Sequence, residues 1–224
     1  MWRARCMASM PALPVPPPTH PFLPLTHETR VWYRVHPFDA ATGKYGPAAF
    51  NDSGLGWARF SPLWNPTTSE AIATIYAGSS VNVAIMEVVL HNVPTPSTGY
   101  LHDLQRDYDA GLLLSRVRTS MLSLVNLTAT GLRAAGLTVT DLFDGDEHDC
   151  ARTQAWAQWI WQKMPDVQGF HWMSKRDNRD EVVMLFGDRI KAGFKDDGDS
   201  RPLEAYEQEI IDLLAEMSAG VALK

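Results

Sequence analysis

The stretch "AIATIYAGSSVNVAIMEVVL", residues 71–90, contains a strand pattern, a turn and a helix pattern in immediate succession. Residues 71–77 include Ile, Thr and Tyr, which favour a strand. Ser79 and Ser80 are good helix N-caps, so we predict a helix from about Val81 to His91. This helix is apolar on nearly all sides, and a helix of that kind is buried in the fold.

Glu87 is the one charged residue in this stretch. Removing an unpaired carboxylate from water costs several kcal/mol or more, so it needs a partner or a function. The residues one helical turn away on either side do not neutralise it. We therefore expect the partner to come from elsewhere, with Arg34 in "VWYRVH" and Arg59 in "GWARFSP" as the candidates. The plainer alternative is an Arg–Glu pair that only stabilises packing.

The patterns on either side of this stretch predict an α+β fold, a mixed β-sheet flanked by helices. Strands are expected at 31–36, 112–128, 169–174 and 181–187, and helices at 129–137, 150–164 and 202–217. The two types alternate irregularly, without the regular rhythm of βαβ units. Residues 36–66 are rich in Gly, Pro, Asn and Asp, and a loop of this length within a domain is often functional.

Length and composition indicate one globular domain with extensions. The chain has 224 residues, of which 45% are hydrophobic. We expect a Pro-rich arm over residues 1–28, a domain over 29–190 and a helical extension over 191–224. Cys6 falls in the arm and Cys150 in the domain, so we expect no disulfide and a reducing compartment.

The charge pattern argues against binding to nucleic acid, and the distribution of apolar residues and prolines argues against a membrane span and a signal peptide. The formal net charge is −6 and no convincing basic stretch is present, so we expect no direct binding to nucleic acid. No apolar run approaches the ~20 residues that a membrane span requires. Repeated prolines interrupt the N-terminal segment where a signal peptide would need an apolar helix. These features predict a cytoplasmic protein.

The common catalytic motifs are absent from the sequence. There is no G-x-x-x-x-G-K-[ST] loop, no G-x-G-x-x-G after a strand and no H-E-x-x-H. The run "DGDEHDC", residues 144–150, offers several metal-ligating side chains but is typical of an acidic surface loop. Without a second cluster of ligands we predict no metal site there.

An ordered set of segments resembles the RES-domain family, whose members are toxins of bacterial toxin–antitoxin pairs. The segments are "VWYRVH", "GLGWARFSPLW", "IYAGSSVNVAIMEVVLHNV" and "GFHWMSKR", followed by "VVMLFGDR". They cover most of the chain, so the resemblance identifies residues 29–190 as a RES-like catalytic domain. Ala58 departs from the pattern, because many members have Gly before the arginine that corresponds to Arg59.

The resemblance implies an ADP-ribosyltransferase-like fold, NAD as the substrate, and a role for particular residues. Arg34, Glu87 and Ser174 correspond to the family's Arg, Glu and Ser and are the expected catalytic residues. Arg59 and Tyr76, together with Arg34 and Ser174, are expected to bind NAD. It also implies a helix-turn-helix antitoxin as partner, a homo-oligomer, and phosphate as an alternative co-substrate.

The chemistry of NAD cleavage agrees with these residue types. Breaking the nicotinamide–ribose bond builds positive charge on the ribose, which a carboxylate in a dry pocket stabilises. Guanidinium groups bind pyrophosphate, and an aromatic face can stack on a ring of the ligand. Glycohydrolase and phosphorylase activity are the expected reactions. The alternatives are a protein ADP-ribosyltransferase and a non-catalytic binding module with a structural Arg–Glu pair.

Overall fold

The computed structural model describes residues 22–39, 41–42, 44–143, 150–190 and 194–222. Its centre is an eight-stranded sheet with the order β1-β8-β9-β10-β5-β2-β7-β11. Neighbouring strands are antiparallel except β8 and β9, which are parallel, so the sheet is mixed. The strands are β1 (Pro24–His27), β2 (Arg30–Pro37), β5 (Thr74–Gly78), β7 (Leu112–Thr119), β8 (Leu122–Asn126), β9 (Gly169–Met173), β10 (Glu181–Phe186) and β11 (Phe194–Pro202).

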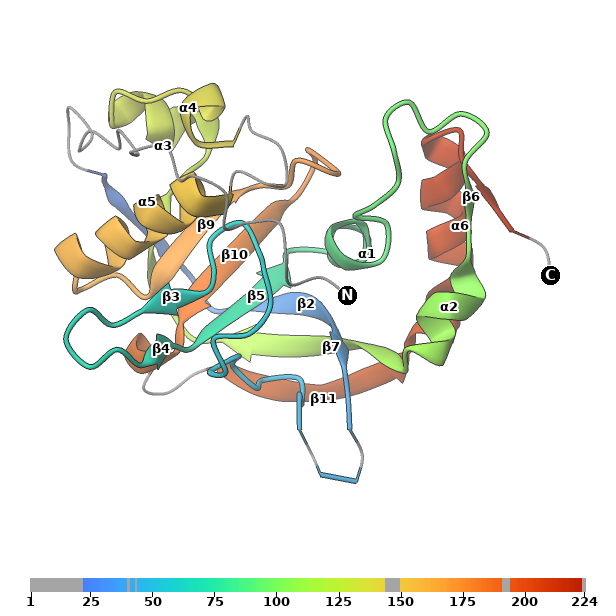
Figure 1. Cartoon of the computed structure of the whole chain (residues 1–224), viewed down its shortest axis with the longest axis horizontal. Helices are drawn as coiled ribbons and strands as arrows, with labels where there is room; N and C mark the ends of the chain where they lie inside the picture. Colours follow the sequence, from blue (N-terminus) through green and yellow to red (C-terminus); the bar gives the residue numbers. More distant parts are fainter. Residues whose placement is uncertain (1–21, 40, 43, 144–149, 191–193, 223–224) are drawn as a thin grey trace.

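The helices form two groups with α1 between them (Figure 1). Helices α3 (Ala129–Ala134), α4 (Val139–Phe143) and α5 (Cys150–Lys163) lie together near β9, and α2 (Leu104–Asp109) and α6 (Glu207–Glu216) lie at the other end of the molecule. Helix α1 spans Val81–Val88. The shorter elements are β3 (Leu63–Trp64) paired with β4 (Ala71–Ile72), β6 (Leu101–His102) paired with β12 (Gly220–Val221), and the 3₁₀ turns η1 (Gly187–Arg189) and η2 (Leu203–Tyr206).

Side-chain alternation along the strands divides the core between the two faces of the sheet. One face carries Tyr33, Tyr76 and Met184 and is covered by α1, α5 and α6. The opposite face carries Trp32, Ile75 and similar residues of β7, β8 and β10. The face on which a strand residue points therefore decides which helix or loop it can contact.

The turn from β5 into α1 is determined by a helix cap and by a glycine. The Ser80 side chain accepts a hydrogen bond from the Val83 N–H at 3.2 Å, as an N-cap does. Gly78 precedes this turn, and a Cβ there would lie 2.4 Å from Val83 Cγ1, so a larger residue would clash. Val83 and Ile85 are both 0% exposed, which agrees with the apolar pattern of the helix.

The structure confirms the predicted α+β class, with a mixed sheet flanked by helices. It differs from the prediction in segments whose hydrophobic pattern is weak. Residues 24–27 and 194–202 form strands β1 and β11 at the two edges of the sheet, although the sequence placed them in the N-terminal arm and the C-terminal extension. Polar or Pro-containing segments can join a sheet through backbone hydrogen bonds alone. Such pairing leaves no hydrophobic pattern in the sequence. The expected domain boundary at residue 190 thus falls between two strands of one sheet.

Several other expectations concern Cys150, membrane helices and the acidic run. Cys150 is buried, and Cys6 lies outside the described residues. Within the described ranges, no helix has the length and apolar character needed to cross a membrane. The acidic residues 144–149 lie outside the described residues. Helix α1 ends at Val88, about a turn earlier than predicted.

Candidate functional site

The carboxylate of Glu87 is bound by the hydroxyl of Ser174. The Ser174 Oγ donates to Glu87 Oε1 at 2.6 Å, across 87 residues of sequence. Ser174 is fully buried and Glu87 is half-buried, so the pair lies at the boundary between core and solvent. Two of the three residues expected to be catalytic are therefore in direct contact.

The backbone around Ser174 determines where its hydroxyl proton points. The Oγ accepts hydrogen bonds from the N–H groups of Arg176 at 3.1 Å and Asp177 at 3.0 Å. A serine hydroxyl has two lone pairs and one proton, so these contacts leave the proton for Glu87. This bond holds the Glu87 carboxylate in one orientation.

The start of α1 is tied to the β9–β10 hairpin that carries Ser174. Ser80 Oγ donates to Asp180 Oδ2 at 2.7 Å, and the Ser79 N–H donates to the Glu181 carbonyl at 2.8 Å. Asp180 also accepts the Ser174 N–H through its own carbonyl at 2.9 Å. The helix bearing Glu87 and the turn bearing Ser174 are thus held together by several hydrogen bonds.

Arg34 does not pair with Glu87, in contrast to the expectation from sequence. Tyr33 and Val35 pack with α1, and alternate strand residues point to opposite faces, so Arg34 points to the face away from that helix. Its guanidinium donates to the carbonyls of Gly46 at 3.0 Å and Pro47 at 2.9 Å. Burial lowers the pKa of Arg34 to about 10, so the group stays charged at neutral pH.

Arg59 and Tyr76 are brought together by a tight turn that rests on α5. Tyr76 donates its hydroxyl proton to Ser61 Oγ at 3.1 Å, and its ring meets Trp172 edge to face. Burial raises the pKa of the Tyr76 hydroxyl. Gln154 of α5 donates to the carbonyls of Ala58 and Ser61, which fixes the turn.

The Phe143 carbonyl links this turn to the serine. Arg59 Nη1 donates to Phe143 O at 3.3 Å, and Lys175 Nζ donates to the same oxygen at 2.6 Å. Lys175 directly follows Ser174, so Arg59 belongs to the same region as the Glu87–Ser174 pair. Sequence reasoning did not assign a role to Lys175, although the basic residues after Ser174 were the available signal.

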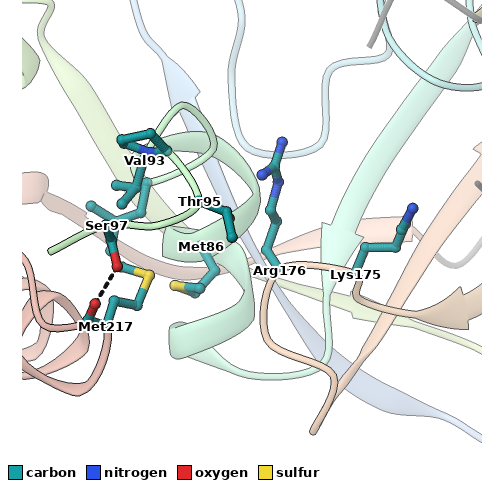
Figure 2. Close-up of a pocket in the computed structure, with 9 residues that line it drawn as sticks. Met86, Val93, Thr95, Ser97, Lys175, Arg176 and Met217 are labelled. Atoms are coloured by element: carbon teal, nitrogen blue, oxygen red, sulfur yellow. Dashed lines mark hydrogen bonds between the residues drawn. The ribbon is translucent and has the colours of Figure 1, made fainter. Parts of the chain in front are cut away.

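A cavity of about 250 Å³ includes the chain neighbours of both members of the pair, Met86 and Lys175 (Figure 2). Figure 2 shows Lys175 and Arg176 extending from the β9–β10 turn in the same general direction. The rest of the lining is apolar or hydroxyl-bearing and consists of Leu90, Val93, Pro94, Thr95, Ser97 and Met217.

The arrangement suits stabilisation of positive charge. Glu87 is an oriented carboxylate, and Arg59 and Lys175 supply positive charge close by for an anionic group of a ligand. In the part of the chain that the structure describes, no group of three or more His, Cys, Asp or Glu side chains is arranged to hold a metal ion.

Comparisons with known proteins agree with this fold. The model of the RES domain family matches residues 31–205. A chain from the crystal structure of the M. tuberculosis MbcT–MbcA toxin–antitoxin complex is similar, with 20% sequence identity and a TM-score of 0.54. The similarity covers 83% of this chain and 91% of that chain, and at this identity it shows the fold alone. Comparison with curated proteins found no match.

Proposed function

The chain belongs to the RES-domain family, and on that premise we propose that it is an NAD-consuming toxin of a toxin–antitoxin pair. The reaction would cleave the nicotinamide–ribose bond. The hydrogen bond from Ser174 to Glu87 carries this proposal, because it orients a carboxylate at the edge of the core. That is the group an oxocarbenium-like transition state requires.

In this mechanism Glu87 stabilises the ribose as positive charge develops. The bond between ribose C1′ and the nicotinamide nitrogen breaks, and nicotinamide leaves with the bonding electron pair. The oxygen of water, or of phosphate, forms the new bond to C1′, and a proton is released to solvent. Ser174 keeps Glu87 in place, and Arg59 offsets negative charge on the ligand.

Tyr76 and Arg34 have supporting roles in the proposal. Tyr76 anchors the turn that carries Arg59 through its hydrogen bond to Ser61. Arg34 acts as a positioning residue, since its two bonds to the Gly46 and Pro47 carbonyls support the loop that precedes Arg59.

We further propose a helix-turn-helix antitoxin as the partner, with assembly of the toxin as a homo-oligomer. The support is the family membership and the fold shared with a chain of a toxin–antitoxin complex. Co-expression with the neighbouring gene product, followed by purification through a tag on this chain, tests the partner. Recovery of this chain alone would contradict it.

Incubation of the purified protein with NAD tests the reaction. We expect release of nicotinamide, with ADP-ribose as product in water and ADP-ribose 1″-phosphate if phosphate is the acceptor. Mass spectrometry of reactions with and without phosphate distinguishes the two. Transfer of ADP-ribose to a protein in a bacterial lysate would instead favour a protein ADP-ribosyltransferase.

Replacing Glu87 by Gln is the sharpest test of the catalytic assignment. The variant keeps the shape of the side chain and removes its charge, so we expect NAD turnover to fall about 100- to 1,000-fold. Thermal unfolding checks that the variant folds. Glu70→Gln, at an exposed position, is the matched control and should turn over NAD at the wild-type rate. A fully active Glu87→Gln protein would end the proposal.

A further inference from the structure

We propose that Lys175 and Arg176, at the β9–β10 turn, bind the pyrophosphate of NAD beside the Glu87–Ser174 pair. The inference rests on the proposed function and adds two binding residues to the site. It also places the main pyrophosphate contact at this turn, whereas the sequence had pointed to the guanidinium groups of Arg34 and Arg59.

The first observation is that the positively charged groups of Lys175 and Arg59 lie at the same backbone carbonyl. Both side chains donate to the Phe143 carbonyl, at 2.6 Å and 3.3 Å. Two donors that share one oxygen lie within reach of a single phosphate group. A ligand with two linked phosphates could span from this point to the next side chain along the turn, Arg176.

The second observation is the charge of the cavity. Figure 2 draws the 9 residues that line it, and these include Lys175 and Arg176 but no acidic residue. The chain as a whole has 26 acidic and 20 basic residues, so this local balance runs against the composition. A cavity lined by two cationic side chains and no carboxylate favours an anionic ligand.

The third observation is that several hydrogen bonds hold the backbone of the turn in place. The N–H groups of Arg176 and Asp177 bind Ser174 Oγ, and the Asn178 N–H binds the Ser174 carbonyl at 2.9 Å. The Asp177 carboxylate pairs with Arg179 at 2.6 Å. A rigid backbone loses little conformational entropy on binding, which favours affinity.

Arg34 is less suited to this role. It points to the face of the sheet away from α1, the helix that carries Glu87. The cavity volume of about 250 Å³ is below the ~300–1,000 Å³ of pockets that enclose a drug-sized ligand. It therefore fits one phosphate-bearing portion of NAD, while the reacting ribose lies toward Glu87.

Binding of two anionic probes, inorganic pyrophosphate and ADP-ribose, tests the site without any turnover. Isothermal titration calorimetry would compare wild type with Lys175→Gln and Arg176→Gln. Loss of one charge-assisted hydrogen bond should weaken binding of each probe about tenfold. Arg133→Gln removes the same charge from an exposed position on α3 and should bind as wild type does. Thermal unfolding confirms that each variant is folded.

Steady-state kinetics separate this inference from the proposed function. In both turn variants we expect KM for NAD to rise about tenfold while kcat stays within about twofold of wild type. Wild-type KM and probe affinity in both variants would overturn the inference and leave NAD cleavage standing. Probe binding that depends on the turn, in a protein that never cleaves NAD, would support the anion site and reject the proposed function.

Discussion

At the scale of single residues, the hydroxyl of Ser174 is the most constrained group near the site. It accepts two backbone N–H groups and donates to Glu87, so its three hydrogen-bonding positions are all used. The same contacts shape the turn and orient the carboxylate. The turn and the carboxylate therefore depend on one atom.

Replacing Ser174 by Ala should affect both stability and activity. The variant leaves two backbone N–H groups without their acceptor, so we expect the free energy of unfolding to fall by about 1–3 kcal/mol. Glu87 also loses the donor that orients it, so kcat for NAD should fall at least about tenfold. Urea unfolding and steady-state kinetics measure the two effects. Ser120→Ala, at an exposed position, is the control. Unchanged kcat in Ser174→Ala would contradict the orienting role.

At the scale of elements, α1 is a short helix whose start is connected to a distant hairpin. Ser80 caps the helix through the Val83 N–H and also donates to Asp180, which precedes β10. A helix of this length is marginal alone, so its position depends on such tertiary contacts and on its buried face. The cap thus supports the helix that carries Glu87.

Replacing Ser80 by Ala should lower the free energy of unfolding by about 1–2 kcal/mol, because it removes the cap and the bond to Asp180. Chemical unfolding followed by circular dichroism measures the loss. Ser80→Thr keeps a hydroxyl that can cap the helix and should recover most of the stability. Equal stability of the Ala and Thr variants would show that the hydroxyl does not matter.

At the scale of the whole molecule, a partly buried polar cluster joins the edge strand β1 to the centre of the sheet. The rings of His27 and His171 lie 4.3 Å apart, and His171 Nδ1 is 3.5 Å from Glu181 Oε1. Arg30 Nη1 completes the cluster at 3.0 Å from Glu181 Oε2. Burial, followed by the nearby His171, lowers the pKa of His27 to about 4. Interaction with His171 is the main cause that lowers the pKa of Glu181 to about 2.

Stability should therefore decrease in acid. Between pH 6.5 and about 4, His27 becomes protonated in the unfolded state but stays neutral in the folded state. Proton binding therefore stabilises the unfolded state relative to the folded state as the pH falls. We expect the free energy of unfolding to fall by about 1–3 kcal/mol across this range. Glu181 adds a further loss between about pH 4.5 and 2.

His27→Gln removes the titrating group and should flatten the pH dependence between pH 6.5 and 4. Unfolding curves at several pH values measure the slope, and His91→Gln, outside the cluster, should keep the wild-type slope. A slope that is the same in all three proteins would exclude His27 as its source.

The sequence by itself determined the mixed α+β class, the buried α1 and the unusual position of Glu87. These features follow from local patterns of apolar residues and caps, which a chain carries whatever its tertiary contacts. The family pattern added Ser174, which does contact Glu87 in the fold.

Only the tertiary structure decided which groups lie beside that carboxylate. Arg34 seemed suitable from the chemistry of its neighbours, but strand alternation turns it to the opposite face of the sheet. Lys175 and Arg59 are far apart in sequence and meet because both reach the Phe143 carbonyl. Edge strands β1 and β11 also escaped prediction, because backbone pairing between distant segments leaves no periodic signal in side chains.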